Sequence, residues 1–366
     1  MVRVYLDHNA TTPLRAEARD AMIAAMDVVG NPSSVHAEGR AAKGLVEKAR
    51  AQVAALVGCR VQQVIFTSSA TEAAALSVAQ KGRHGGVFAA LPTEHDCLGV
   101  WSEVALASVY DLSGRVDPAW RETLPPGLIA VSAANSETGV MAPGSAVVGS
   151  SPGKAVVCDI TQMAGKVPVV YGAQTPSYAI LSAHKLGGPK GIGALINFTA
   201  DDPEPMLKGG GQEMNRRSGT ENMIGIAGFG AGAEAAGRDV AAGRWEEIAE
   251  FRNILELSLE AGSNKTIFVG KAAARLPNTS CILTEGWKGE TQVMQMDLAG
   301  FAISAGSACS SGKVKASRVL TAMGFDETQA ASAIRVSLGL ETTRDEVLRF
   351  ADAWLAKLRK HEQRAA

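Results

Sequence analysis

The sequence has few features that would suit it to a nucleic acid, a metal centre or a membrane. Its 36 lysines and arginines nearly balance its 37 aspartates and glutamates, so no positive excess indicates a nucleic-acid footprint. Its five cysteines are scattered without a CxxC pair, which supports neither a zinc site nor a disulfide framework. No apolar run is long enough to cross a bilayer, and the first residues lack a signal-peptide pattern. We therefore expect a cytoplasmic protein in a reducing compartment, without a metal, nucleic-acid or membrane partner.

What the chain does have is enough length and apolar content for a sizeable core. It contains 366 residues, 46% of them hydrophobic, which allows two domains. Strand-like runs alternate with helical ones between residues 64 and 198, which predicts a mostly parallel sheet covered on both faces by helices. The predicted strands are 64–66, 86–91, 105–110, 128–132, 155–158, 178–181 and 192–198. Ligands of such sheets bind at the carboxyl ends of the strands.

The rest of the chain predicts further helices and a second, smaller group of strands. Helical spacing covers residues 16–26, 45–57, 224–236 and 245–260, and the last of these leads into the smaller domain. Short strands are predicted at 267–269, 279–283, 301–303 and 332–338. The final helix starts at Thr343, which forms a capping box with Glu346.

The most informative stretch lies around residue 185. Ser182, His184 and Lys185 follow a buried strand and precede a glycine-rich turn. A lysine amine held at the mouth of a β-rich core can form a Schiff base with an aldehyde, and the other two side chains could hold an anion. Taken alone, the stretch also fits a solvated lysine in a loop.

Other polar residues also fall where predicted strands end. Thr71 lies in a hydroxyl-rich turn that opens a helix, which can bind phosphate through free N–H groups or can simply be an N-cap. Further polar residues follow later strands: His95, Asn135, Asp159 and Gln162. A lysine, a phosphate cradle and a carboxylate for a pyridinium nitrogen are what pyridoxal phosphate requires.

With these residues in place, the chain resembles a cysteine desulfurase of the NifS/IscS type, within the class V aminotransferases. The similarity runs from Tyr5-Leu6-Asp7 to Arg335-Val336-Ser337-Leu338-Gly339. Its most specific parts are Ser182-Ala183-His184-Lys185, Gly219-Thr220-Glu221-Asn222 and Gly306-Ser307-Ala308-Cys309-Ser310. The resemblance implies the pyridoxal-phosphate fold type I, an α/β fold with a mostly parallel seven-stranded sheet between helices, plus a smaller α+β domain. It implies a large domain of residues 15–244, and a small one of residues 1–14 and 245–366.

The resemblance also implies roles around the cofactor. Lys185 would carry the Schiff base and move protons, and Asp159 would pair with the ring nitrogen. Gln162 and Asn135 would face the ring 3-oxygen and the substrate, and His95 would stack on the ring. The phosphate ligands would be Ala70 through its backbone, Thr71, Ser182 and His184, with Thr220 reaching the phosphate of a partner subunit in a homodimer.

The same resemblance implies the reaction. Arg335, with Asn31, would hold the carboxylate of L-cysteine. Cys309 would take the substrate sulfur as a persulfide, leave alanine, and pass the sulfur to an acceptor or scaffold protein for iron–sulfur cluster assembly or another transfer. The alternatives are a selenocysteine lyase, another class V aminotransferase, or a non-catalytic scaffold with an inert Cys309.

The chain departs from the family pattern at several positions. Ser69 replaces a glycine of the phosphate loop, and Ser136 replaces a second asparagine. Met214-Asn215 replaces Arg-Gly, and Ala73-Ala74 replaces Ser-Asn. Ser69 is compatible with the phosphate loop only if its backbone does not need a positive φ.

Overall fold

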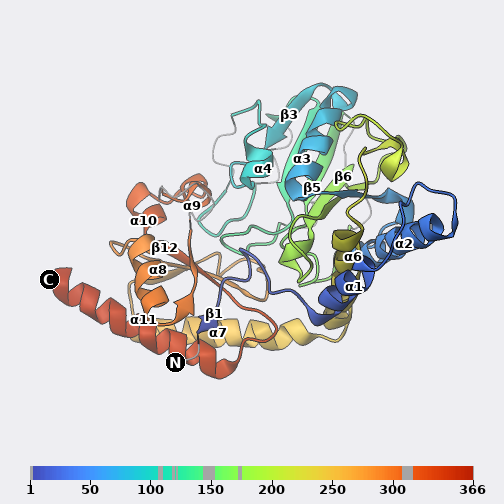
Figure 1. Ribbon diagram of the computed structural model, residues 1–366. Coiled ribbons are helices and arrows are strands. Elements are labelled where there is room, and N and C mark those ends of the chain that lie inside the picture. Colours follow the sequence, from blue (N-terminus) through green and yellow to red (C-terminus); the bar gives the residue numbers. More distant parts are fainter. Residues whose placement is uncertain are drawn as a thin grey trace.

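Two sheets organise the computed structural model, which describes residues 3–105, 110–117, 120, 123–142, 153–171, 175–306 and 316–365 (Figure 1). Among these residues the large sheet has six strands, in the order β2-β7-β6-β5-β4-β3. Their bounds are β2 (Val64–Thr67), β3 (Val87–Ala90), β4 (Gly127–Ser132), β5 (Lys154–Asp159), β6 (Tyr178–Ser182) and β7 (Gly193–Asn197). Strands β3 to β6 are parallel, whereas β7 is antiparallel to both of its neighbours.

The sheet therefore confirms an α/β fold but is more mixed than expected. We expected seven mostly parallel strands, and the described residues form six. The predicted strand at 105–110 lies largely outside the described residues. The connection from β6 to β7 is residues 183–192, which is shorter than the crossover that a parallel pair of strands needs, so β7 runs antiparallel to β6.

Helices cover both faces of the large sheet (Figure 1). One face packs against α3 (Ala70–Ala79) and α4 (Asp96–Gly99), and the other against α2 (Ala37–Val57) and α6 (Met223–Ala241). The helix α1 (Ala16–Met26) packs on α6. Neighbouring residues of a strand, such as Ile65 and Phe66 in β2, belong to opposite apolar clusters, as the alternation of side chains in a strand requires.

The smaller sheet is antiparallel and is built from the C-terminal part of the chain, and the N-terminal strand forms a separate parallel pair beside it. Its order is β11-β12-β9-β8, and β1 pairs separately with β10. The bounds are β1 (Val4–Tyr5), β8 (Thr266–Val269), β9 (Thr279–Thr284), β10 (Phe301–Ala302), β11 (Ser304–Ala305) and β12 (Ala333–Ser337). The predicted strand 301–303 therefore ends at Ala302, and the chain passes into β11 two residues later.

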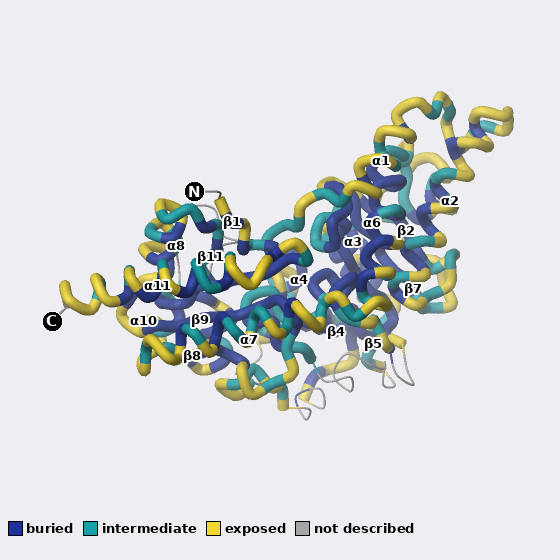
Figure 2. Tube along the Cα trace, turned by 90° about the horizontal axis from the view of Figure 1, so that it is seen from below, coloured by how far each residue is buried: buried dark blue, intermediate teal, exposed yellow. Residues whose placement is uncertain are grey.

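Five helices accompany this smaller sheet in the described residues. They are α7 (Arg244–Gly262), α8 (Gly289–Leu298), α9 (Arg318–Ala322), α10 (Glu327–Ala331) and α11 (Arg344–Ala365). Val4 and Leu6 share a buried core with side chains of α7 and α11, so the N-terminal strand packs with the last third of the chain. Figure 2 shows these buried segments inside a layer of exposed helix surfaces.

Most helix boundaries agree with the sequence pattern. The predicted capping box before α11 is confirmed, since the Thr343 N–H donates to Glu346 and the Glu346 N–H donates to the Thr343 hydroxyl. The helix α2 begins at Ala37, earlier than predicted, because the His36 ring caps a first part that has no apolar period. It ends as expected at Gly58, whose φ of 67° is left-handed. No described helix combines the length and apolarity needed to span a bilayer.

Candidate active site

A cavity of about 400 Å³ lies where the carboxyl ends of the large-sheet strands meet the N-terminal segment and the smaller sheet. This volume is in the usual range for a small-molecule site. Nine residues predicted from the sequence line it: Ala70, Thr71, His95, Asp159, Gln162, Ser182, His184, Lys185 and Arg335. They come from separate strand ends, as expected for an α/β sheet.

Lys185 lies just past the end of β6, in the short helical turn Ala183–Lys185. Its amine donates to the backbone carbonyls of Asn9 (2.7 Å) and Ala10 (2.8 Å). The Thr12 hydroxyl donates to the backbone carbonyl of Lys185 in turn. The segment after β1 therefore holds the lysine at the cavity, a role that the sequence analysis did not predict because backbone carbonyls leave no side-chain signature.

Asp159 ends β5 and is nearly buried, with 8% of its surface exposed. One carboxylate oxygen accepts from the backbone N–H of Thr161 at 2.8 Å. Gln162, also buried, donates from Nε2 to the Asn9 carbonyl at 3.0 Å. A buried carboxylate at a cavity wall is suited to a cationic partner such as a protonated ring nitrogen.

The N-terminus of α3 supplies the anion-binding part of the cavity. Ser69 caps the helix by accepting from the Glu72 N–H at 3.2 Å, and Glu72 in turn accepts from the Ser68 N–H. A side chain in place of Gly193 would approach the Ser69 backbone to 2.5 Å, so this glycine lets strand β7 and the helix start lie together. Free N–H groups at such an end favour phosphate.

Two histidines lie at the cavity, and each has one ring nitrogen close to a polar group of the protein. Burial, with the nearby positive charge of Lys185, lowers the pKa of His184 to about 4, so the ring is neutral at pH 7. Its Nδ1 lies 3.1 Å from the Thr11 hydroxyl. The Nδ1 of His95 accepts from the Cys97 N–H at 3.2 Å, so a neutral His95 ring carries its proton on Nε2.

Arg335, on β12, is held by Asp7 at 2.7 Å and by the Ser136 carbonyl at 3.1 Å. Its Nε is buried and has no hydrogen-bond partner among the described residues, which leaves a donor for a ligand. The structure does not bring Asn31 to it within one chain. Asn31 lies on the exposed loop between α1 and α2, where its side-chain oxygen accepts from the Ser33 N–H.

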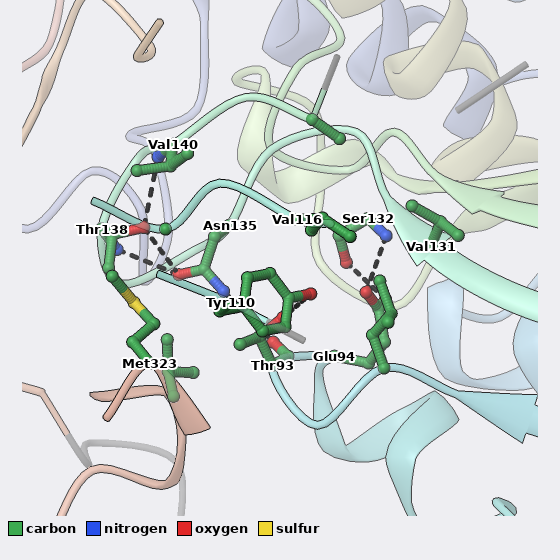
Figure 3. A pocket seen from close by; sticks show the side chains of 14 residues that line it. Thr93, Glu94, Tyr110, Val116, Val131, Ser132, Asn135, Thr138, Val140 and Met323 are labelled. Carbon is green, nitrogen blue, oxygen red and sulfur yellow. Dashed lines mark hydrogen bonds between the residues drawn. The ribbon is translucent and has the colours of Figure 1, made fainter. Parts of the chain in front are cut away.

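Asn135 also lies elsewhere than expected. It lines a second, smaller pocket with Thr93 and Tyr110 (Figure 3). Its side-chain oxygen accepts from the backbone N–H groups of Glu137 and Thr138, and its nitrogen donates to the Thr93 carbonyl. The amide is thus occupied by its own loop, which explains why the expectation that it faces the cavity differs from the structure.

The second pocket contains a buried acid that sequence analysis missed. Glu94 accepts from both the backbone N–H and the hydroxyl of Ser132, at 2.8 and 2.6 Å. Burial raises the pKa of Glu94 to about 7. The signal available in the sequence was its place directly before His95, after a strand end.

The departures from the family pattern cost the site little. Ser69 has a φ of −171°, an extended conformation open to any residue. Asn215 has a φ of 66°, in the left-handed region that asparagine tolerates better than most residues. Ser136 lines the cavity, and its backbone carbonyl accepts from Arg335 and Asn9, contacts that do not depend on the side chain. Ala73 and Ala74 lie on α3 itself and are buried in the core that it shares with the sheet.

Two of the remaining cysteines act as packing residues. Cys158 and Cys281 are fully buried in strands, and burial raises the pKa of both thiols well above the ordinary value. Burial raises the pKa of Cys59 to about 12.

Two further residues predicted from the sequence are not in the cavity. Thr220 is exposed and outside it, and Cys309 lies outside the described residues. No cluster of metal-ligating side chains occurs in the parts of the chain that are described.

Comparison with known proteins places this geometry in a family. The model of the aminotransferase class-V family matches residues 4–350, and the chain belongs to that family. It is 38% identical to a cysteine desulfurase of Frankia sp. (strain EuIK1), covering 95% of this chain and 90% of the relative. It is 37% identical to the cysteine desulfurase IscS of Anaeromyxobacter sp. (strain Fw109-5), covering 98% and 93%. The X-ray structure of a NifS-like protein from Rickettsia africae ESF-5 superposes with a TM-score of 0.86 at 30% identity, covering 97% of this chain and 99% of that one.

Proposed function

We propose that the protein is a pyridoxal-phosphate-dependent cysteine desulfurase. It converts L-cysteine and the Cys309 thiol into L-alanine and a persulfide on Cys309, which then passes its outer sulfur to an acceptor. The observation that carries this proposal is the convergence of Lys185, Asp159 and the start of α3 on one cavity. Relatives named cysteine desulfurase, at up to 38% identity over most of the chain, support the choice of reaction.

The residues present fit pyridoxal phosphate. The amine of Lys185 would bind its aldehyde carbon, and the buried carboxylate of Asp159 would face its ring nitrogen. The start of α3, with Thr71, Ser182 and the neutral ring of His184, would hold the phosphate. When bound, the cofactor supplies an electron sink for bond cleavage next to the substrate α-carbon.

The protein residues then bind the substrate and move protons. Arg335 has a buried Nε without a partner in the described structure, and a guanidinium suits a carboxylate such as that of L-cysteine. Lys185 Nζ, steadied by two backbone carbonyls, would carry a proton to and from the substrate α-carbon. His95 would lie against the cofactor ring and take part in proton transfer.

Cys309 completes the transfer. Its thiolate would attack the sulfur of the substrate and form a new S–S bond. The C–S bond breaks with its electron pair left on the substrate β-carbon, and uptake of a proton there gives alanine. An ordinary cysteine has a pKa of about 8.5, so local activation of the thiol is required. Ser304, which lies five positions before Cys309 in the sequence, lines the cavity and supports delivery of the following segment to it.

A homodimer is part of the proposal. Thr220 is exposed and lies away from the cavity of its own chain, which suits a contact with the phosphate of a partner. Three exposed apolar side chains precede it, at Met206, Leu207 and Met214, and a second copy would cover them.

We further propose two domains, a large one of residues 15–244 and a small one of residues 1–14 and 245–366. We also propose a cytoplasmic location, with iron–sulfur cluster assembly or another sulfur transfer as the pathway.

Incubation of the purified protein with L-cysteine tests the proposal. We expect alanine to form in step with sulfur and mass spectrometry to locate the persulfide on Cys309. Cys309→Ala should stop sulfur transfer while the yellow, borohydride-sensitive chromophore remains. Unchanged turnover by that variant would point instead to a selenocysteine lyase or another class V aminotransferase. A protein without the chromophore would indicate a scaffold.

A further inference from the structure

A buried lysine lies behind the cavity wall. Lys166 is only 2% exposed, and it lines none of the cavities described above. Its amine donates to two oxygens of one residue, the backbone carbonyl and side-chain Oε1 of Gln162, both at 3.0 Å. No carboxylate of the described residues forms an ion pair with it. A buried amine without a counter-ion costs stability, so it calls for a functional reason.

The chain fixes this amine firmly. Lys166 lies in the turn after β5, and its backbone N–H donates to Met163 at 3.0 Å. The preceding Gly165 has a φ of 78°, and a side chain there would meet Ala236 at 2.9 Å. The carbonyl of Gly165 also accepts from the Trp245 indole at 2.8 Å. The turn can therefore adopt this shape only with a glycine, and it aims the Lys166 stem at Gln162.

We propose that Lys166 is a positioning residue that sets the orientation of the Gln162 side-chain amide; this inference rests on the function proposed above. A lysine amine with two acceptors as partners is a donor whether charged or neutral, so the amide must turn its oxygen toward Lys166. The amide NH₂ then lies on the side of Asn9, whose carbonyl takes one of its protons at 3.0 Å. The second N–H is the group that Gln162 can donate to the ring oxygen of bound pyridoxal phosphate.

Without Lys166 the hydrogen bond that holds the Gln162 side-chain oxygen in this orientation is lost. A turned amide would present its oxygen to an anionic ring oxygen, and repulsion would replace a hydrogen bond.

The test is a pH titration of the visible absorption of the bound cofactor, read together with cofactor affinity. In Lys166→Met holoenzyme the pH midpoint of the spectral change should rise by about one unit, and apoprotein should bind pyridoxal phosphate about tenfold more weakly, the size expected for one hydrogen bond to a charged group. Lys190→Met is the matched control, because it removes an exposed lysine near the site without touching Gln162, and its midpoint should stay near that of the wild type.

A double-mutant cycle separates positioning from charge. In a Gln162→Leu background, Lys166→Met should shift the midpoint little further, because its partner is gone. An equal shift in both backgrounds would overturn the inference and assign a direct charge effect.

The variant Gln162→Glu provides a second test if Lys166→Met folds poorly. It keeps an oxygen toward Lys166 but removes the NH₂ group, so the pH midpoint of its spectral change should also rise. An unmoved midpoint in a yellow Gln162→Glu protein would refute the inference alone, whereas wild-type protein that binds no pyridoxal phosphate would refute it together with the proposed function.

Discussion

Two buried basic side chains, Arg50 and Lys166, differ in the kind of partner that accepts their hydrogen bonds. Arg50, 2% exposed, forms two hydrogen bonds to the carboxylate of Glu213, at 2.7 and 2.8 Å. Lys166 is equally buried, yet only uncharged oxygens accept from it. The first cation is neutralised by its own chain and holds the fold. The second has no carboxylate partner among the described residues and contacts Gln162, which lines the cavity.

The largest effect is expected at the cavity itself. Lys185→Ala should lower turnover of L-cysteine by at least about a thousandfold, because the group that moves the proton at the α-carbon is lost. Its folding should hardly change, since the Asn9 carbonyl keeps its hydrogen bond from Gln162 and Ala10 is only partly buried. Steady-state alanine production and thermal unfolding measure the two effects. A variant that lost stability and activity in parallel would contradict a purely chemical role.

Arg50→Met should have the opposite effect: it should lower the stability of the fold and leave turnover per molecule of bound cofactor nearly unchanged. It leaves the Glu213 carboxylate buried without a cation, at a cost of about 3–5 kcal/mol in the free energy of unfolding. The cost is raised by the backbone that this pair holds, because Glu213, Met214 and Asn215 all have left-handed φ values between 47° and 66°. Urea denaturation measures the loss.

A matched variant keeps this interpretation testable. Arg50→Met combined with Glu213→Gln removes both charges and should recover part of the stability. Turnover per molecule of bound cofactor should remain close to that of the wild type in both variants. If the double variant were no more stable than Arg50→Met, the unpaired carboxylate would not be the cause of the loss.

From the sequence, residues that line the cavity were easier to predict than the residues that hold them in place. Asp159 and Lys185 were found because each follows an apolar run, and strand ends of such sheets gather ligand groups. Asn31 and Asn135 were expected near the ligand from the family resemblance, but both amides pair with nearby backbone, which residue type alone does not reveal. The reversed direction of β7 was not predicted either, because the alternation of side chains is the same in parallel and antiparallel strands.

The unpaired state of Lys166 predicts a pH-dependent stability of the apoprotein. Burial, followed by the positive charges of Lys185 and Arg335, lowers the pKa of Lys166 to about 7, against 10.5 in an unfolded chain. Between these values the unfolded chain binds a proton that the folded one does not, so stability should rise with pH across this window. Below pH 7 both states are protonated and the penalty is constant.

Comparison with Lys166→Met isolates this contribution. The variant should unfold with a free energy at least about 1 kcal/mol higher than wild type at pH 7, since one unit of pKa corresponds to about 1.36 kcal/mol, and the gap should narrow toward pH 9.5. Chemical denaturation of both apoproteins at the two pH values measures it. A gap that widened with pH would mean that the folded protein favours the charged amine.

The smallest effect is expected where the chain differs from its family but carries no buried charge. Ser69→Gly restores the family residue at the start of α3. The extended backbone at φ −171° needs no glycine, so nothing is gained there, and the hydroxyl that caps the Glu72 N–H is lost. Glycine at an N-cap costs only a few tenths of a kcal/mol relative to serine. Cofactor affinity should therefore change by less than about twofold in equilibrium titrations, because the N–H groups that face the phosphate remain. A much larger change would show that the hydroxyl itself contacts the phosphate. Ser69 would then be a cofactor-binding residue as well as a helix cap.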